Sequence, residues 1–104
     1  MRVLGVDPGT IRCGWGVVRL DGSRLEHLGS GVLEVGRGDI STRLAAVHAG
    51  LCAVLADQEP AAMGLERNFV ARNVQSAFRL GEARGVALAA AASFGIVPVE
   101  YTPM

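Results

Sequence analysis

The 104-residue sequence contains no lysine, carries no formal net charge and has only two cysteines. Its ten basic residues are all arginine, and ten acidic residues balance them. A domain without excess positive charge is not expected to bind nucleic acid through a general basic surface. Because half of the residues are hydrophobic, we expect one globular domain covering residues 1–104.

Long apolar runs and export signals are also absent. The longest apolar stretch, residues 86–92, is mostly alanine and is too short to cross a bilayer. The first residues lead directly into an apolar segment, without the basic region, apolar core and cleavage site of a signal peptide. We therefore expect no membrane segment and a cytoplasmic location.

The two cysteines, Cys13 and Cys52, have no C-x-x-C spacing. Without a secretory signal, free and buried thiols are a better prediction than a disulfide. His48 precedes Cys52 by four residues, so a helix could present both to a metal, but no second pair completes a zinc site. His27 stands alone in a polar segment and is predicted to lie at the surface.

The hydrophobic pattern predicts an α/β domain with five strands and two helices. Residues 2–7 are rich in valine and leucine, which is typical of a central buried strand. Asp21 and Gly22 predict a hairpin turn, and Gly29 and Gly31 predict a bend or bulge in the strand that follows. The predicted strands are 2–7, 13–20, 24–35, 61–66 and 96–101, and the predicted helices are 43–56, capped by Asp39 or Ser41, and 74–93, capped by Asn73. After a crossover helix, the fourth strand should run parallel to its neighbour.

Two acidic residues each end an apolar strand: Asp7 ends the first and Glu66 the fourth. An acid at the end of a buried strand is costly unless a cation meets it. Adjacent strands lie about 4.8 Å apart, so the two carboxylates could share one small volume. Magnesium ions suit such a site, and two bridged ions would serve phosphodiester hydrolysis. A single such acid is more simply explained as a solvated loop residue, whereas two favour a metal site.

The arginines are unevenly distributed. Between residues 67 and 84 there are four arginines and a single acid, Glu82, for a local charge of +3. The arginines are Arg67, Arg72, Arg79 and Arg84. Guanidinium groups suit phosphate oxygens, so this stretch indicates either a phosphate-facing helix start or a solvated helix face.

The second predicted helix contains Gly81 and Gly85, each costing about 1 kcal/mol relative to alanine in a helix interior. Small residues four apart permit close backbone approach. The sequence leaves two explanations open: packing against the sheet, or a helix-to-helix contact in a dimer.

Three segments, residues 5–18, 28–34 and 65–87, together resemble the RuvC-type Holliday junction resolvases. The first reads GVDPGTIRCGWGVV, the second LGSGVLE, and the third LERNFVARNVQSAFRLGEARGVA. Within the third, the residues in register with the family are Glu66, Phe69, Asn73, Ser76, Ala77, Leu80, Gly81 and the run 83–86. The resemblance implies an RNase H-like fold, with a mixed five-stranded sheet flanked by helices.

The resemblance also implies roles for particular residues. Asp7 and Glu66 match the family's first two metal-binding catalytic acids, which act with Mg²⁺, two ions in a complete site. Phe69 matches an aromatic residue that stacks on an unpaired base at the junction, a contact worth about 1 to 3 kcal/mol. Arg72 and Asn73, at a helix N-terminus, then become expected DNA phosphate contacts.

The family's assembly and partners follow from the same resemblance. The helix carrying Gly81 and Gly85 corresponds to the dimer interface, and two-fold symmetry provides two active sites for symmetric nicks. The implied partners are four-way junction DNA, a second copy of the chain and the branch-migration motor complex.

The sequence departs from the family pattern beyond residues 101–103, since it stops at Met104. The family continues into a basic segment and a final helix with two further catalytic acids, so we expect an incomplete copy that lacks the last helices. Glu100 is the only acid after Glu82 and lies in a predicted strand, so it receives no catalytic role.

Two alternatives remain open. A chain without the later acids could be a junction-binding module that does not cleave. The sequence DPGT at residues 7–10 also resembles the phosphate-binding hairpin of sugar kinases and actin-like proteins, although that explanation leaves LERNF at residues 65–69 unaccounted for.

Overall fold

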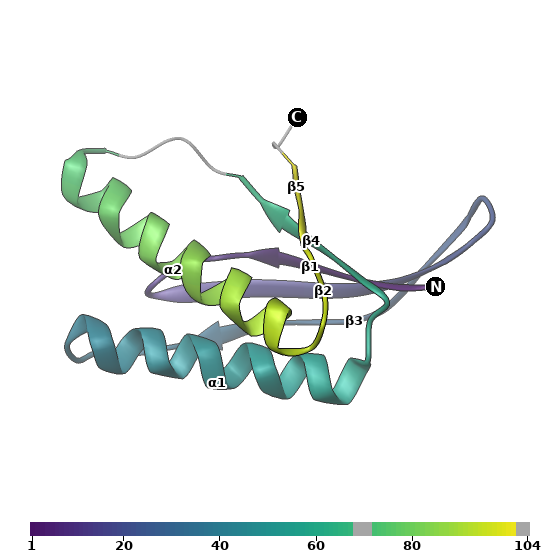
Figure 1. Cartoon of the computed structure of the whole chain (residues 1–104), viewed down its shortest axis with the longest axis horizontal. Coiled ribbons are helices and arrows are strands. Elements are labelled where there is room, and N and C mark those ends of the chain that lie inside the picture. The colour runs from purple at the N-terminus through teal and green to yellow at the C-terminus, as the bar shows by residue number, and fades with distance from the viewer. Residues whose placement is uncertain (68–71, 102–104) are drawn as a thin grey trace.

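A five-stranded mixed sheet with two helices forms the structure, a computed structural model that describes residues 1–67 and 72–101 (Figure 1). The strands are β1 (Arg2–Asp7), β2 (Arg12–Asp21), β3 (Arg24–Glu34), β4 (Ala62–Glu66) and β5 (Val99–Tyr101), and the helices are α1 (Ile40–Gln58) and α2 (Val74–Ser93). The strand order is β3-β2-β1-β4-β5. β1 pairs antiparallel with β2 and parallel with β4, and β4 pairs parallel with β5. The predicted fold class and the parallel fourth strand are confirmed.

One hydrophobic core lies between the sheet and both helices, which pack against each other (Figure 1). Strand alternation directs Leu4 and Val6 of β1, and Met63 and Leu65 of β4, into this core. The remaining core residues are Cys13, Val17, Val47, Leu51, Val54, Leu55, Ala87, Ala90 and Ala91. The alternate residues of the strands therefore lie on the opposite side of the sheet.

We call that opposite side the open face and define it by Gly5, Asp7, Gly64 and Glu66. In the described part of the chain, both helices lie on the other side of the sheet. The exposed side chain of Val99, which pairs with Gly64, is consistent with an uncovered surface here.

Helix α1 begins three residues earlier than the spacing predicted and ends two residues later. Asp39 is its N-cap, with the side chain accepting a hydrogen bond from the Thr42 amide at 3.3 Å. At the other end Glu59 adopts a left-handed conformation with φ of 48°, and its amide donates to the Leu55 carbonyl. Asp39 is one of the two caps that the sequence predicted, so the cap is confirmed, while the apolar spacing alone placed the helix ends too far inside.

In length and mean hydropathy, 1.3, α1 would be able to cross a membrane. A core helix meets the same criterion. Here Val47, Leu51, Val54 and Leu55 are buried and belong to the core. These four residues of α1 therefore serve the fold of this domain.

Helix α2 begins where its cap predicted, because the Asn73 side chain accepts a hydrogen bond from the Ser76 amide at 2.9 Å. Its buried face consists of alanines, namely Ala83, Ala87, Ala90 and Ala91. Gly81 and Gly85 lie on the exposed side, where an added Cβ would meet no atom within 4 Å. Packing against the sheet is therefore not the reason for these two glycines.

The third and fifth predicted strands need correction in detail. The bulge falls at Leu28, because Val17 pairs with Gly29 and Val18 pairs with His27. It thus lies beside Gly29, as predicted, and not at Gly31. β5 covers only residues 99–101 instead of 96–101, since Ile96 is still tied to α2 by a hydrogen bond to the Ala91 carbonyl.

Candidate active site

The structure brings Asp7 and Glu66 together at one edge of the open face. They are the last residues of β1 and β4, and the parallel register pairs Val6 with Leu65 directly before them. Because Val6 and Leu65 point into the core, the next residue of each strand points to the open face. Gly14 of β2 faces Asp7, and an added Cβ there would lie 3.9 Å from the Asp7 Cβ.

The two carboxyl groups influence each other's protonation. The pKa of Glu66 is raised above the ordinary glutamate value, first by desolvation and then by the negative charge of Asp7 and a side-chain hydrogen bond with it. A proton or a cation between the two groups would relieve this repulsion. The arrangement thus fits a divalent cation, since carboxylate oxygens are the ligands that magnesium prefers.

These residues form only part of a metal site. Within residues 1–67 and 72–101, no group of three or more histidine, cysteine, aspartate or glutamate side chains lies close enough to hold an ion. Asp7 and Glu66 would therefore need waters, substrate oxygens or further carboxylates to complete the coordination.

Sequence reasoning missed one residue of this region, Tyr101. It pairs with Glu66 across β4 and β5. The pKa of its hydroxyl is raised, first by burial and then by the charges of Glu66 and Asp7. Only the register of the edge strand reveals that Tyr101 shares a face with the acids, so the sequence pattern held no direct signal for it.

The predicted DNA-binding residues fall into two groups. Phe69 lies outside the described residues. Arg72 is exposed directly before α2, while Asn73 uses its side-chain oxygen to cap that helix. Asn73 is therefore first a structural cap, and Arg72 is the better placed of the two for a phosphate.

A groove of about 410 Å³ lies beside this helix start. Its lining residues are Gly9, Thr10, Ile11, Arg43, Asn73, Gln75, Ser76, Arg79 and Leu80. Arg43 holds the loop between β1 and β2 in place, donating to the Thr10 carbonyl at 3.1 Å and to its Oγ1 at 2.9 Å. The loop that follows Asp7 is thus fixed to α1.

The local charge of the arginine-rich stretch is smaller than the sequence count. Arg79 pairs with Glu82, three residues later on α2. Arg84 forms an ion pair with Glu100 of β5, which the sequence count had left out. These two arginines are therefore engaged within the fold.

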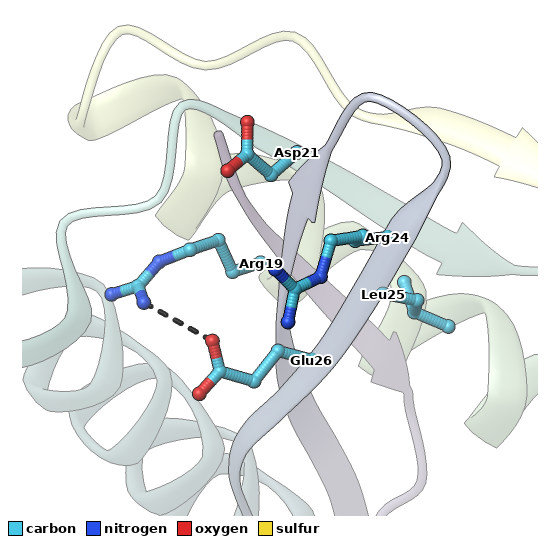
Figure 2. A pocket seen from close by; sticks show the side chains of 5 residues that line it. All are labelled: Arg19, Asp21, Arg24, Leu25 and Glu26. Atoms are coloured by element: carbon cyan, nitrogen blue, oxygen red, sulfur yellow. Dashed lines mark hydrogen bonds and ion pairs between the residues drawn. The ribbon is translucent and has the colours of Figure 1, made fainter.

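A separate pocket of about 360 Å³ lies at the tip of the β2–β3 hairpin (Figure 2). Its lining residues are Arg19, Asp21, Arg24, Leu25 and Glu26, and Arg19 donates to Glu26 at 3.2 Å. Because Arg19 pairs with Arg2 at the start of β1, this pocket lies at the end of the sheet away from Asp7. Its charges are mixed, and it takes no part in the carboxylate site.

Both cysteines are free, as predicted, although only Cys13 is fully buried. Burial raises the pKa of the Cys13 thiol to about 11, a hydrogen bond from the Gly9 backbone opposes this shift, and the charge of Asp7 adds to it. The Cys52 sulfur lies 3.8 and 3.9 Å from the two ring nitrogens of His48. In the described chain no third ligand joins them. His27 is exposed, as predicted.

The sheet order, with an acid at the exit of each of two adjacent parallel strands, is that of an RNase H-like domain. The family described as crossover junction endodeoxyribonuclease RuvC matches residues 3–104. The chain therefore belongs to the RuvC family.

Individual relatives agree with this assignment. The crossover junction endodeoxyribonuclease RuvC of Paracoccus denitrificans is 43% identical over 103 residues, covering 99% of this chain and 63% of that protein. The Stutzerimonas stutzeri protein of the same name is 45% identical over 100 residues, covering 96% and 58%. The structure of T. thermophilus RuvC in complex with Holliday junction substrate matches with a TM-score of 0.92 and 32% identity, over 100% of this chain and 64% of that one. This chain thus spans less than two thirds of the length of these relatives.

Proposed function

We propose that this chain carries the first two catalytic acids of a Holliday junction resolvase. This enzyme is a Mg²⁺-dependent endodeoxyribonuclease that makes symmetric nicks in four-way DNA junctions during recombination and repair. The observation that carries the proposal is the side-by-side placement of Asp7 and Glu66 on the open face. The names of the relatives support it, as does the junction DNA in the T. thermophilus complex.

Asp7 and Glu66 would hold the cation, and the fold fixes the positions of their carboxylates in advance. Magnesium, two ions in a complete site, supplies the Lewis acidity that phosphodiester hydrolysis needs. The two parallel strands fix the spacing of the carboxylates, and the core beneath them limits their movement. Gly14 opposite Asp7 leaves the approach to that carboxylate free of a neighbouring side chain.

The exposed side of α2 is our candidate for a homodimer interface. It bears Val74 and Phe78, which are 73% and 68% exposed. A largely apolar groove of about 560 Å³ is lined by Val74, Ala77, Phe78, Gly81 and Glu82. Two copies of α2 could approach closely at Gly81 and Gly85 around a two-fold axis, which would place two carboxylate sites on one junction.

The remaining roles are proposed from the family resemblance. Arg72 contacts a DNA phosphate at the start of α2, Asn73 supports it there, and Phe69 stacks on an unpaired base. A branch-migration motor complex is the further proposed partner, and the cytoplasm the proposed location.

A paired binding and nicking experiment tests the function. The chain is incubated with a labelled four-way junction and with linear duplex of the same sequence, in EDTA for gel shifts and in Mg²⁺ for nicking. We expect selective junction binding, with nicking lost in Asp7→Asn and Glu66→Gln. Asp21→Asn, the same chemical change at the far end of the sheet, serves as the matched control and should have no effect.

The outcomes separate the candidate functions. Equal affinity for junction and duplex would overturn the resolvase proposal. Selective binding without nicks would favour the junction-binding module. Tight ATP binding would instead revive the sugar-kinase or actin-like explanation of residues 7–10.

A further inference from the structure

Tyr101 extends from β5 across the open face, over β4 and as far as β1. Its ring lies over Gly64 of β4, where an added Cβ would be 3.1 Å from Cε1 and 3.4 Å from Cδ1. Its hydroxyl reaches β1 and would be 4.0 Å from a Cβ on Gly5. Gly5 lies two residues before Asp7 on the same face of β1, so the hydroxyl of Tyr101 lies two residues along the strand from Asp7, on the face that carries both acids.

Two glycines make room for this ring. Gly5 and Gly64 are in register on β1 and β4, and an added Cβ on either would lie within 4.0 Å of the Tyr101 side chain. An aromatic ring over a strand glycine is itself a stabilising arrangement, because it replaces the missing side-chain packing. Phenylalanine would provide that packing equally well, so packing does not account for the hydroxyl.

The position of Tyr101 is fixed from both sides of β5. Its carbonyl accepts a hydrogen bond at 2.6 Å from the amide of Arg67, the residue directly after Glu66. Glu100, on the opposite side of the strand, is ion-paired with Arg84 of α2. These two contacts therefore fix the position of Tyr101 relative to Glu66.

We propose that Tyr101 is a positioning residue of this site, whose hydroxyl hydrogen-bonds an oxygen ligand of the cation that Asp7 and Glu66 bind. The inference rests on the proposed cation site and adds a residue to it. Groups that orient metal ligands in this way commonly change metal affinity about 10- to 100-fold when removed. Tyr101 would thus influence the affinity of the site for the cation without contacting the cation itself.

The test measures Mn²⁺ binding to the chain by electron paramagnetic resonance of the free ion, together with the thermal midpoint. Tyr101→Phe keeps the ring over Gly64 and removes only the hydroxyl. We expect about tenfold weaker Mn²⁺ binding with an unchanged midpoint. Val97→Ala, at an exposed residue in the segment before β5, is the control and should bind Mn²⁺ normally.

A second readout uses the fact that Tyr101 is the chain's single tyrosine. 3-Fluorotyrosine gives one ¹⁹F resonance, which should shift on addition of Mg²⁺ in the otherwise unmodified chain and not in Glu66→Gln. Unchanged Mn²⁺ affinity in Tyr101→Phe would overturn the role of Tyr101 alone. Absence of Mn²⁺ binding in the unmodified chain would overturn the cation site as well, and with it the inference.

Discussion

Replacing the exposed glycines of α2 with alanine should have opposite effects on the monomer and on the dimer. Alanine is about 1 kcal/mol more favourable than glycine in a helix interior. At Gly81 and Gly85 the new methyl group would meet no atom within 4 Å in the monomer. We therefore expect Gly81→Ala and Gly85→Ala each to raise the free energy of unfolding of the monomer by about 1 kcal/mol, or the midpoint by about 4 to 8 °C.

Gly50→Ala in α1 is the matched control, because it offers the same gain in helix propensity. There the new Cβ would lie 2.8 and 3.0 Å from the two methyl carbons of Leu33. Overpacking of this kind typically costs about 1 to 3 kcal/mol, which cancels or exceeds the gain. We expect Gly50→Ala to be no more stable than the unmodified chain.

The assay is urea denaturation at a dilution where sedimentation shows monomers, followed by sedimentation at higher concentration. If α2 forms the dimer, the alanine methyls at Gly81 and Gly85 separate the two helices and weaken association. Lower monomer stability in both variants would refute the packing argument. Unchanged association in the double variant would refute the proposed interface.

Three further predictions concern a core leucine, the two cysteines and Glu66. Leu51→Ala, at a fully buried position of α1, should lower the free energy of unfolding by about 2 to 5 kcal/mol in calorimetry or urea titration, and a smaller loss would show that the core closes around the cavity. Cys52 should react with a thiol reagent in the native state, while the buried Cys13 should react only after unfolding. The native pKa of Cys13 is about 11 against an ordinary 9.0. The contribution of the neutral Cys13 thiol to stability is therefore complete below pH 9 and is lost as the pH rises toward 11. The raised pKa of Glu66 means that protons compete with the cation at a higher pH than for an ordinary glutamate, so Mn²⁺ affinity should fall on acidification through that raised pKa, and a midpoint at or below the ordinary value would contradict the coupling to Asp7.

The carboxylate pair could be predicted from the sequence because its signal is local. Each acid directly follows an apolar strand, and the crossover rule makes the two strands parallel, so their ends meet at one edge. The cap of α2 was equally visible, since Asn73 precedes the helix pattern by one residue. Such features depend on residues close together in the chain.

What could not be predicted depends on register between distant segments. The ion pair of Arg84 with Glu100 joins a helix to an edge strand, and neither residue's neighbours indicate it. Tyr101 shares a face with Glu66 only because β5 pairs with β4 in this one register, and a shift of one residue would turn it to the other face. The alternatives for Gly81 and Gly85 likewise needed the orientation of α2, which the sequence pattern leaves open.

The most direct test of the account is the activity of a chimera in which this chain replaces the matching part of the Paracoccus denitrificans relative, of which it covers 63%. The account predicts Mg²⁺-dependent nicking of four-way junctions by the chimera. It also predicts that nicking is lost in both Asp7→Asn and Glu66→Gln, with Asp21→Asn unaffected. Normal nicking by either of the first two variants would contradict the proposal that Asp7 and Glu66 are catalytic acids.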